Sequence, residues 1–287
     1  MQLKKTERSK AKIKMALQGP SGSGKTMSAL LIAQGLTNND LSKVAVIDTE
    51  NGSANLYAHL GGYNVLNLGI PHSTERYIEA MDLCINSGME VIIIDSISHC
   101  WDYLLDYHAS LPGNSFANWA KITPMQKAFV DKILQSSVHI IATMRVKQDY
   151  VLSERNGKMV PEKVGLKAIQ RDEISYEFTI VFDIDSKHFA ISSKDRTQLF
   201  EGKPQFAINS QTGKKILDWC NSTVTQQELT QKVTECDNLQ ELSALYNKHV
   251  DIAKTMEKEF IEKRDLLQQL DNQATKNSNG NGTQSSQ

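Results

Sequence analysis

Residues 19–26, Gly19-Pro-Ser-Gly-Ser-Gly-Lys-Thr26, decide the fold class of this chain. They match the complete phosphate-binding pattern Gly-x-x-x-x-Gly-Lys-Thr. A short apolar run, Ile13–Leu17, precedes them and predicts a buried strand, and a run rich in Ala and Leu, Met27–Leu36, follows them and predicts a helix. In this order the loop N–H groups and the positive end of the helix dipole converge on one phosphate. The stretch therefore predicts a P-loop that binds a nucleotide.

The residue types within the loop assign a role to most of its positions. Glycines let the backbone wrap closely around phosphate oxygens. Lys25 is expected to reach the β- and γ-phosphates of ATP, and the hydroxyl of Thr26 is expected to bind Mg²⁺. The expected nucleotide-binding residues of the loop are Gly19, Pro20, Ser21, Gly22, Ser23, Gly24, Lys25 and Thr26.

The bulk composition fits a globular protein with one large core. The chain has 287 residues, of which 40% are hydrophobic and 23% charged, and these fractions are typical of globular domains. The net charge of −1 does not indicate a nucleic-acid partner, so such a partner would need a local basic patch. The four cysteines lie far apart, which is typical of a reducing cytoplasm, and no apolar run approaches a membrane span.

Strands and helices are expected to alternate in residues 13–220. Short aliphatic runs separated by longer amphipathic runs predict parallel strands joined by helical crossovers. The next strand candidates are Val44–Ile47, Asn64–Leu68, Val91–Ile94 and Val138–Thr143. Three later runs lie close together and predict antiparallel strands at the sheet edge: Phe178–Phe182, His188–Ile191 and Gln205–Ile208. The expected fold is α/β with a mainly parallel sheet.

The two ends of the chain differ from this core. Residues 1–12 form a basic arm, which would contact nucleic acid or be a solvated terminus. The cations of this region are Lys4, Lys5, Arg8, Lys10, Lys12 and Lys14. Residues 221–270 predict helices with one apolar stripe, which would dock on the core or on a partner. The stripe comprises Ile252, Met256, Phe260 and Leu267. Residues 271–287 hold little to bury and predict a disordered tail.

Nucleotide hydrolysis needs a metal-ordering carboxylate and a group that orients water. Asp95 ends the strongest strand candidate, which places it at the carboxyl edge of the sheet, beside the phosphates. There it would order Mg²⁺ together with Thr26; a cap on the following turn is the alternative. Glu50 follows the strand candidate at 44–47 and is the expected water-orienting group, with Asp48 as its competitor.

The segment Ala45-Val-Ile-Asp-Thr-Glu50, followed by Tyr57 and Leu60-Gly-Gly, resembles the segment after the second strand of RecA-type recombinases. The resemblance implies a RecA-like core in which Glu50 polarises water and Tyr57 contacts adenine; an ordinary surface tyrosine is the alternative. The run from His139 to Lys147 is similar to the fourth core strand of that family. It implies that Thr143 senses the γ-phosphate where the recombinases usually carry Gln, or is simply a β-branched strand residue.

The run Ser193-Lys-Asp-Arg-Thr197 is similar to the Lys-Asn-Arg/Lys motif of RecA-type proteins. The resemblance implies that Lys194 and Arg196 act on the γ-phosphate of a neighbouring subunit, and hence a homo-oligomeric ring or filament; a solvated charge cluster is the alternative. The layout from residue 12 to about 210 looks most like compact phage RecA-like ATPases. These include the Sak-type ATP-dependent single-strand annealing or recombination proteins. The resemblance therefore implies a cytoplasmic protein, of a prokaryote or of a phage-infected host, and a single-strand-binding protein is a candidate partner.

The resemblance further implies two loops that bind single-stranded DNA. The first would run from Trp101 to Pro124, although its tryptophans could instead be core. The second would run from Arg145 to Arg171, with seven basic and three acidic residues and an Asn156-Gly157 hairpin signal. Cations with interleaved aromatic rings suit a single-strand groove, and a solvated hairpin is the alternative. The candidate contacts are Arg145, Lys147, Tyr150, Arg155, Lys158, Lys163 and Lys167.

The expected function is DNA-stimulated ATP hydrolysis with Mg²⁺, acting on single-stranded DNA in recombination, annealing or replication. Two other classes stay open. One is a nucleotide-switched assembly ATPase without a nucleic-acid partner, and the other is a P-loop kinase, for which the sequence shows no clear lid with paired arginines. Stimulation of hydrolysis by DNA separates the first function from both alternatives.

Overall fold

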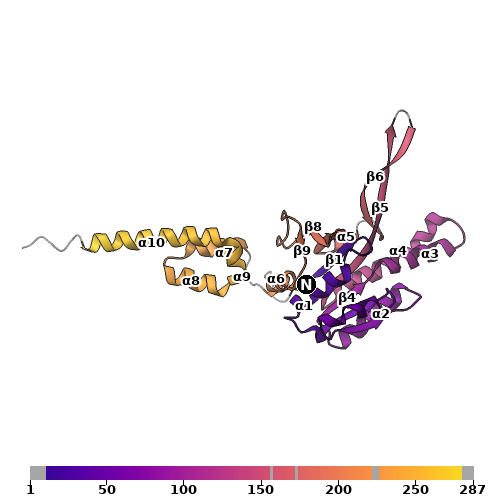
Figure 1. Ribbon diagram of the computed structural model, residues 1–287, viewed down its shortest axis with the longest axis horizontal. Helices are drawn as coiled ribbons and strands as arrows, with labels where there is room; N and C mark the ends of the chain where they lie inside the picture. Colours follow the sequence, from indigo (N-terminus) through magenta and orange to yellow (C-terminus); the bar gives the residue numbers. More distant parts are fainter. Residues whose placement is uncertain (1–10, 156–157, 172–173, 222–225, 280–287) are drawn as a thin grey trace, which may run out of the picture. The chain divides into compact units, whose positions relative to one another are not determined.

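The computed structural model describes residues 11–155, 158–171, 174–221 and 226–279, with the backbone alone at 148–155, 158–166, 251 and 272–279. The chain divides into two units, one spanning Ala11–Trp219 and the other beginning at Cys220 (Figure 1). The basic arm at residues 1–10 lies outside the described residues. Within the described part of the chain, none of the helices combines the length and the apolar character that spanning a bilayer requires.

In the part of the first unit that is described, nine strands form one mostly parallel sheet. Their order is β3-β2-β4-β5-β1-β7-β8-β9, with β6 paired to β5. The strands are β1 Lys14–Gly19, β2 Val44–Asp48, β3 Asn64–Asn67, β4 Val91–Asp95, β5 His139–Arg155, β6 Lys158–Ala168, β7 Ile180–Ile184, β8 Phe189–Asp195 and β9 Phe206–Ala207. The expected α/β fold with a mainly parallel sheet is confirmed.

The antiparallel strands expected near the sheet edge are confirmed, because β7 pairs antiparallel with β8 and β8 pairs antiparallel with β9. The sequence did not indicate that β7 also pairs in parallel with β1 on its other side. The reason for the parallel pairing is the crossover that precedes β7, because the chain returns through α5 (Ile174–Glu177) to the amino edge before β7 begins. The carboxyl end of β7 therefore lies beside the P-loop.

Helices pack on the sheet through apolar side chains. The helices of this unit are α1 Lys25–Leu36, α2 Thr74–Asn86, α3 Ser98–Ser110, α4 Ser115–Gln135 and α5, with 3₁₀-helices η1 Leu41–Lys43 and η2 Ser53–Leu60. Helix α6, Ser210–Asn221, belongs to it up to Trp219. Tyr77 of α2 and Phe129 of α4 are fully buried against Ile92 and Ile94 of β4. The strands read as continuous apolar runs because a parallel sheet is buried on both faces.

The strand β5 has three partners along its 17 residues, and the first of them is β4, with which it pairs in parallel from Val91↔His139 to Ile94↔Ala142. From Lys14↔Ile140 to Gly19↔Arg145 it pairs in parallel with β1. From Val146 onward it pairs antiparallel with β6, and this hairpin extends beyond the rest of the sheet (Figure 1). The predicted hairpin is confirmed, although its turn at 156–157 lies outside the described residues.

The segment Trp101–Pro124 is not the loop that the resemblance implied. It forms most of α3 and the first half of α4, joined by residues 111–114. Asn114 caps α4 by accepting a hydrogen bond from the N–H of Phe116. Buried Leu104 and Ile122 anchor the two helices, and such apolar anchors are what hold a helix against a core.

The second unit has a small hydrophobic core of its own. Its helices are α7 Gln226–Glu235, α8 Leu239–Lys248, α9 Val250–Ala253, η3 Lys254–Met256 and α10 Glu257–Asn279. The expected stripe packs here with Leu229, Val233 and Leu242, because α7 and α8 present apolar faces to it, and the sequence did not indicate this packing within the helical segment itself. Helix α10 also continues through residues 271–279, where a disordered tail was expected.

Candidate active site

Residues 19–26 connect β1 to α1, as the sequence predicts. Gly22 and Gly24 have φ values of 78° and 86°, a left-handed conformation that favours glycine. A Cβ at Gly19 would lie 2.5 Å from the carbonyl oxygen of Ile184. The hydroxyl of Ser23 is buried and has no hydrogen-bond partner among the described residues. A backbone cradle with an unsatisfied hydroxyl at a helix N-terminus fits nucleotide phosphates.

The ammonium group of Lys25 is folded back onto the loop. Its Nζ donates hydrogen bonds to the carbonyl oxygens of Gly19, at 2.9 Å, and Pro20, at 2.8 Å. Burial lowers the pKa of Lys25, although the charges of Asp95 and Glu50 act in the opposite direction. The Lys25 ammonium group therefore lies within the loop, and a bound phosphate oxygen would compete with the two carbonyl oxygens for its hydrogen bonds.

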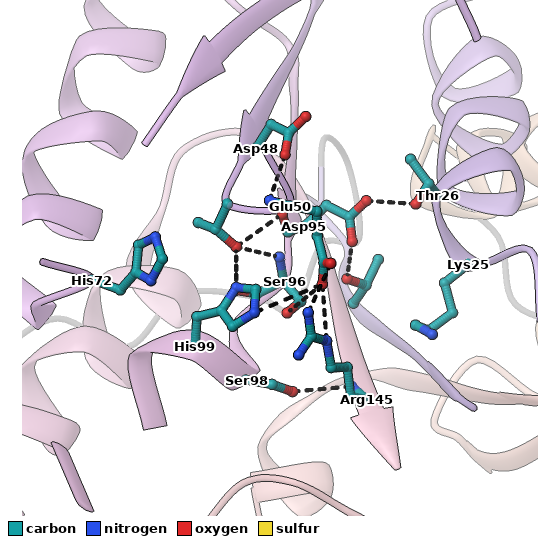
Figure 2. Close-up of polar contacts among 12 residues, drawn as sticks. Lys25, Thr26, Asp48, Glu50, His72, Asp95, Ser96, Ser98, His99 and Arg145 are labelled. Atoms are coloured by element: carbon teal, nitrogen blue, oxygen red, sulfur yellow. Dashed lines mark hydrogen bonds and ion pairs between the residues drawn. The ribbon is translucent and has the colours of Figure 1, made fainter. Parts of the chain in front are cut away.

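Asp95 lies at the end of β4 and joins three elements through its carboxylate. It accepts hydrogen bonds from the hydroxyls of Thr26 on α1, at 2.6 Å, and Thr143 on β5, at 2.5 Å (Figure 2). Burial raises the pKa of Asp95, and the two hydroxyls oppose that shift. The carboxylate and the Thr26 hydroxyl form an oxygen donor set of the kind that Mg²⁺ prefers. The residues predicted to order the metal are thus in contact.

Glu50 lies just beyond β2 and forms a two-pronged ion pair with Arg145 of β5. Nε of Arg145 lies 3.0 Å from Oε1, and Nη2 lies 2.7 Å from Oε2 (Figure 2). Nε2 of His99 and Oγ of Ser96 are farther away, at 4.0 and 3.5 Å from Oε1. Burial acts to raise the pKa of Glu50, but Arg145, with smaller contributions from His99 and Lys25, outweighs it and lowers that pKa.

Asp48, the competing carboxylate, is occupied by the backbone. It accepts the N–H of Glu50 at 2.6 Å and the N–H of Ala54 at 2.9 Å. Its exposed fraction is only 2%. Asp48 therefore shapes the loop that carries Glu50, whereas Glu50 retains partial exposure at the site.

This geometry agrees with the comparison of the chain with known families. Residues 11–226 match the AAA domain family. The chain belongs to the AAA domain family. It is a P-loop NTPase, a class that binds nucleotide, usually with Mg²⁺. A search of curated proteins returned no match.

Sequence reasoning missed three histidines of this AAA domain. His99 of α3 lies 2.7 Å from the hydroxyl of Thr49 and stacks on His72, with ring centroids 5.1 Å apart. In the turn between β7 and β8, Nδ1 of His188 lies 3.0 Å from the carbonyl oxygen of Ser23. No local motif marks these residues, because each reaches the site only through the order of the strands.

Lys194 and Arg196 do not face the P-loop of their own AAA domain. Lys194 pairs with Val181, near the amino end of β7, whereas Gly19 lies against the carboxyl end of that strand. The head groups of both cations donate to the carbonyl oxygen of Tyr176. Any action on a γ-phosphate would therefore take place on a neighbouring subunit, and this stays a prediction.

The remaining predicted residues of the AAA domain are Tyr57, Lys14 and the candidate DNA contacts. Tyr57 is half-buried in η2, beyond Glu50, and its contact with adenine stays a prediction. Lys14 is buried in β1 and donates to the carbonyl oxygens of Ser136 and Val138, so it cannot serve as part of a basic arm. The predicted DNA contacts whose side chains lie outside the described residues are Tyr150, Arg155, Lys158 and Lys163.

Replacing the loop lysine tests the nucleotide site of the AAA domain. Lys25→Ala is expected to lower kcat for ATP hydrolysis by about 10²–10³, because a fixed charge on the transferring phosphate is lost. Phosphate release and binding of a fluorescent ATP analogue measure the change. Lys43→Ala is the matched control, since Lys43 pairs with Glu90 before β2 begins. Turnover like that of the wild type in Lys25→Ala would contradict the assignment.

Proposed function

We propose that this AAA domain protein is an ATPase that acts on single-stranded DNA in recombination, annealing or replication, with hydrolysis stimulated by the DNA. The observation that carries the proposal is a groove beside the nucleotide site. Its volume is about 810 Å³. The residues that line it are Trp101, Asp102, Leu105, Trp119, Lys147, Lys167, Ala168, Ile169, Gln170 and Arg171.

One wall of the groove is aromatic. The rings of Trp101 on α3 and Trp119 on α4 are stacked with centroids 6.1 Å apart, and His108 stacks on Trp119 at 4.3 Å. Both tryptophans are partly exposed, so they are not simply core residues. Stacking on aromatic rings is the sequence-tolerant way in which proteins hold unpaired bases.

A second part of the groove lining is cationic. Lys147 of β5 and Lys167 of β6 are directly opposed in the hairpin register, and Arg171 follows β6. Three cations and one acid, Asp102, line the groove. The groove is therefore a local basic patch, although the net charge of the whole chain is −1. Cations along an aromatic wall suit a single strand, whose phosphates and bases lie on opposite sides.

The walls of the groove connect directly to the nucleotide site. Helix α3 begins three residues after Asp95, and β5 carries Thr143 and Arg145 ahead of Lys147. A strand bound in the groove would therefore contact elements that also hold the two candidate catalytic carboxylates. This continuity supports DNA-stimulated hydrolysis over a site that acts without a nucleic acid.

The residues of this chain fit the hydrolysis of a bound nucleotide. Mg²⁺ would be held by Thr26 and Asp95 and would supply charge neutralisation on the phosphates. Lys25 would bind the phosphate oxygens, and Glu50 would orient the attacking water and accept its proton. Lys194 and Arg196 of a second copy would add charge stabilisation at the γ-phosphate, which supports an oligomeric enzyme.

Variants of the two walls test the DNA site separately. Trp119→Ala should weaken binding of fluorescent oligothymidylate by about 1–3 kcal/mol with little change in salt dependence, because one stacking surface is lost. The double variant Lys147→Ala/Lys167→Ala should reduce the slope of log K against log salt by about 1.4, or about 0.7 for each phosphate contact.

The matched control variants remove the same kinds of side chain, an aromatic ring and two lysines, at positions that do not line the groove. Tyr107→Ala removes a stacked ring of α3 that does not line the groove. Lys43→Ala/Lys127→Ala removes two cations held in ion pairs elsewhere on the unit. Unchanged DNA binding in both groove variants, with ATP hydrolysis independent of DNA, would favour a nucleotide-switched assembly ATPase. Transfer of phosphate to an added acceptor would instead identify a kinase.

A further inference from the structure

Three side chains on one face of β5 link the nucleotide site to the groove. Residues 143, 145 and 147 are spaced by two, so they share one face of the strand and succeed one another at about 6.6 Å. Thr143 bonds Asp95, Arg145 bonds Glu50 and Lys147 lines the groove. One β-strand therefore carries contacts to both candidate catalytic carboxylates and a residue that lines the groove proposed for DNA.

Arg145 occupies the junction between the two halves of this strand. It is the last residue of β5 paired with β1, and Val146 is the first paired with β6. Its backbone is fixed, because its N–H donates to Oγ of Ser98 at 3.0 Å and its carbonyl accepts the N–H of Ile169 at 2.8 Å. The backbone stays in place, so a change of partner at this position falls to the guanidinium group.

We propose that Arg145 couples DNA binding to hydrolysis by exchanging partners, a mechanism that rests on the proposed function. Without DNA its guanidinium holds both oxygens of Glu50, and a phosphate of the bound single strand takes the place of that carboxylate. The planar fork of arginine binds carboxylate and phosphate in the same two-pronged geometry. Arg145 thereby restrains Glu50 until the strand is in the groove.

The surroundings of the pair permit this exchange. The side chains of Arg145 and Glu50 are 38% and 29% exposed, so solvent and an incoming phosphate reach them. Asp102, which lines the groove, exerts its charge on Arg145 and contributes to raising the pKa of that arginine, after the larger effect of its hydrogen bond to Glu50. The guanidinium thus already lies within the electrostatic field of a groove residue.

Release of Glu50 would increase its capacity as a base. While both its oxygens accept from Arg145 and the pKa of the carboxyl is lowered, it binds a catalytic proton weakly. After the exchange, Ser96 and His99 remain beside Oε1 and would keep the carboxylate in position. Restraint and release of this one carboxylate would act as a local electrostatic switch, and the rate of ATP hydrolysis would report its state.

Neutralising Arg145 should release the restraint without DNA. In Arg145→Gln the basal kcat should rise about 5–150-fold, the range of typical coupling between two sites. The ratio of rates with and without oligothymidylate should fall towards one. Arg145→Lys keeps the charge but loses the fork, so it should show a smaller rise and retain some stimulation. Arg264→Gln is the matched control, because it removes an arginine–carboxylate pair of the second unit.

The outcomes separate this mechanism from the proposed function. Binding of a fluorescent ATP analogue shows whether each variant is folded. If Arg145→Gln is not folded, the basal kcat of Arg145→Lys tests the restraint instead. A basal kcat that is unchanged or lower, with ATP and DNA binding intact, overturns the restraint and makes Arg145 a support of the active Glu50. Failure of the wild-type protein to bind single-stranded DNA overturns the proposed function and the release step together.

Discussion

Mixing Arg196→Ala subunits with Lys25→Ala subunits is expected to restore ATP hydrolysis that neither variant shows alone. An arginine acting in trans on a transferring phosphate is worth about 10³–10⁵ in kcat. In a mixed oligomer some interfaces join an intact P-loop to an intact Arg196, so part of this factor returns. The structure motivates the experiment, because Arg196 lies at the opposite end of β7 from its own P-loop.

The control uses subunits that cannot complement each other. Lys25→Ala mixed with the double variant Lys25→Ala/Arg196→Ala contains no intact P-loop, so its rate should stay at the level of either variant. Light scattering verifies that mixed oligomers have formed, and phosphate release measures the rate. If verified mixed oligomers of the first pair remain inactive, Lys194 and Arg196 form a structural cluster on the carbonyls of α5.

Glu50→Gln should abolish most hydrolysis while ATP still binds. The amide keeps the shape of the side chain but accepts no proton, and positioned proton transfer is worth about 10²–10⁴ in rate. Single-turnover hydrolysis and binding of an ATP analogue separate the two effects. Glu90→Gln is the matched control, since Glu90 pairs with Lys43 away from the site.

Asp48→Asn should affect folding rather than chemistry. One of its two oxygens becomes a donor facing a backbone N–H, and a buried donor left unsatisfied costs about 1–3 kcal/mol of unfolding free energy. Urea unfolding measures this loss, and kcat at a temperature where the variant is folded should fall less than in Glu50→Gln. The reverse pattern would assign the water-orienting role to Asp48 instead.

The sequence predicted the parts of the site that are set by local order along the chain. The P-loop needs only a strand, glycines at positions of positive φ and a helix start, and all three are encoded within residues 13–36. The position of Asp95 was predicted for a similar reason, since an apolar run that ends in an acid places that acid at the carboxyl edge of the sheet. The strand pattern likewise predicted the mainly parallel sheet.

The resemblance to RecA-type proteins predicted the wrong secondary structure for one segment. It implied a DNA-binding loop at 101–124, but apolar anchors such as Leu104 and Ile122 hold these residues as helices. The tryptophans still reach the groove, on rigid helices instead of a loop. The apolar stripe at 252–267 correctly indicated helical structure, which the chain forms as α9, η3 and α10, but the sequence did not show that its partners lie on α7 and α8.

The sequence by itself determined that the chain is a P-loop NTPase, because the positions of the P-loop and Asp95 depend on neighbours in the chain and on the direction of parallel strands. Only the tertiary structure decided which groups surround them. Arg145, whose contact with DNA stays a prediction, bonds Glu50, 95 residues away, because β2, β4 and β5 are adjacent in the sheet. His99, His188 and the wall of Trp101 and Trp119 reach their places in the same way. Strand order and helix packing bring such residues together, and neither is visible in local spacing.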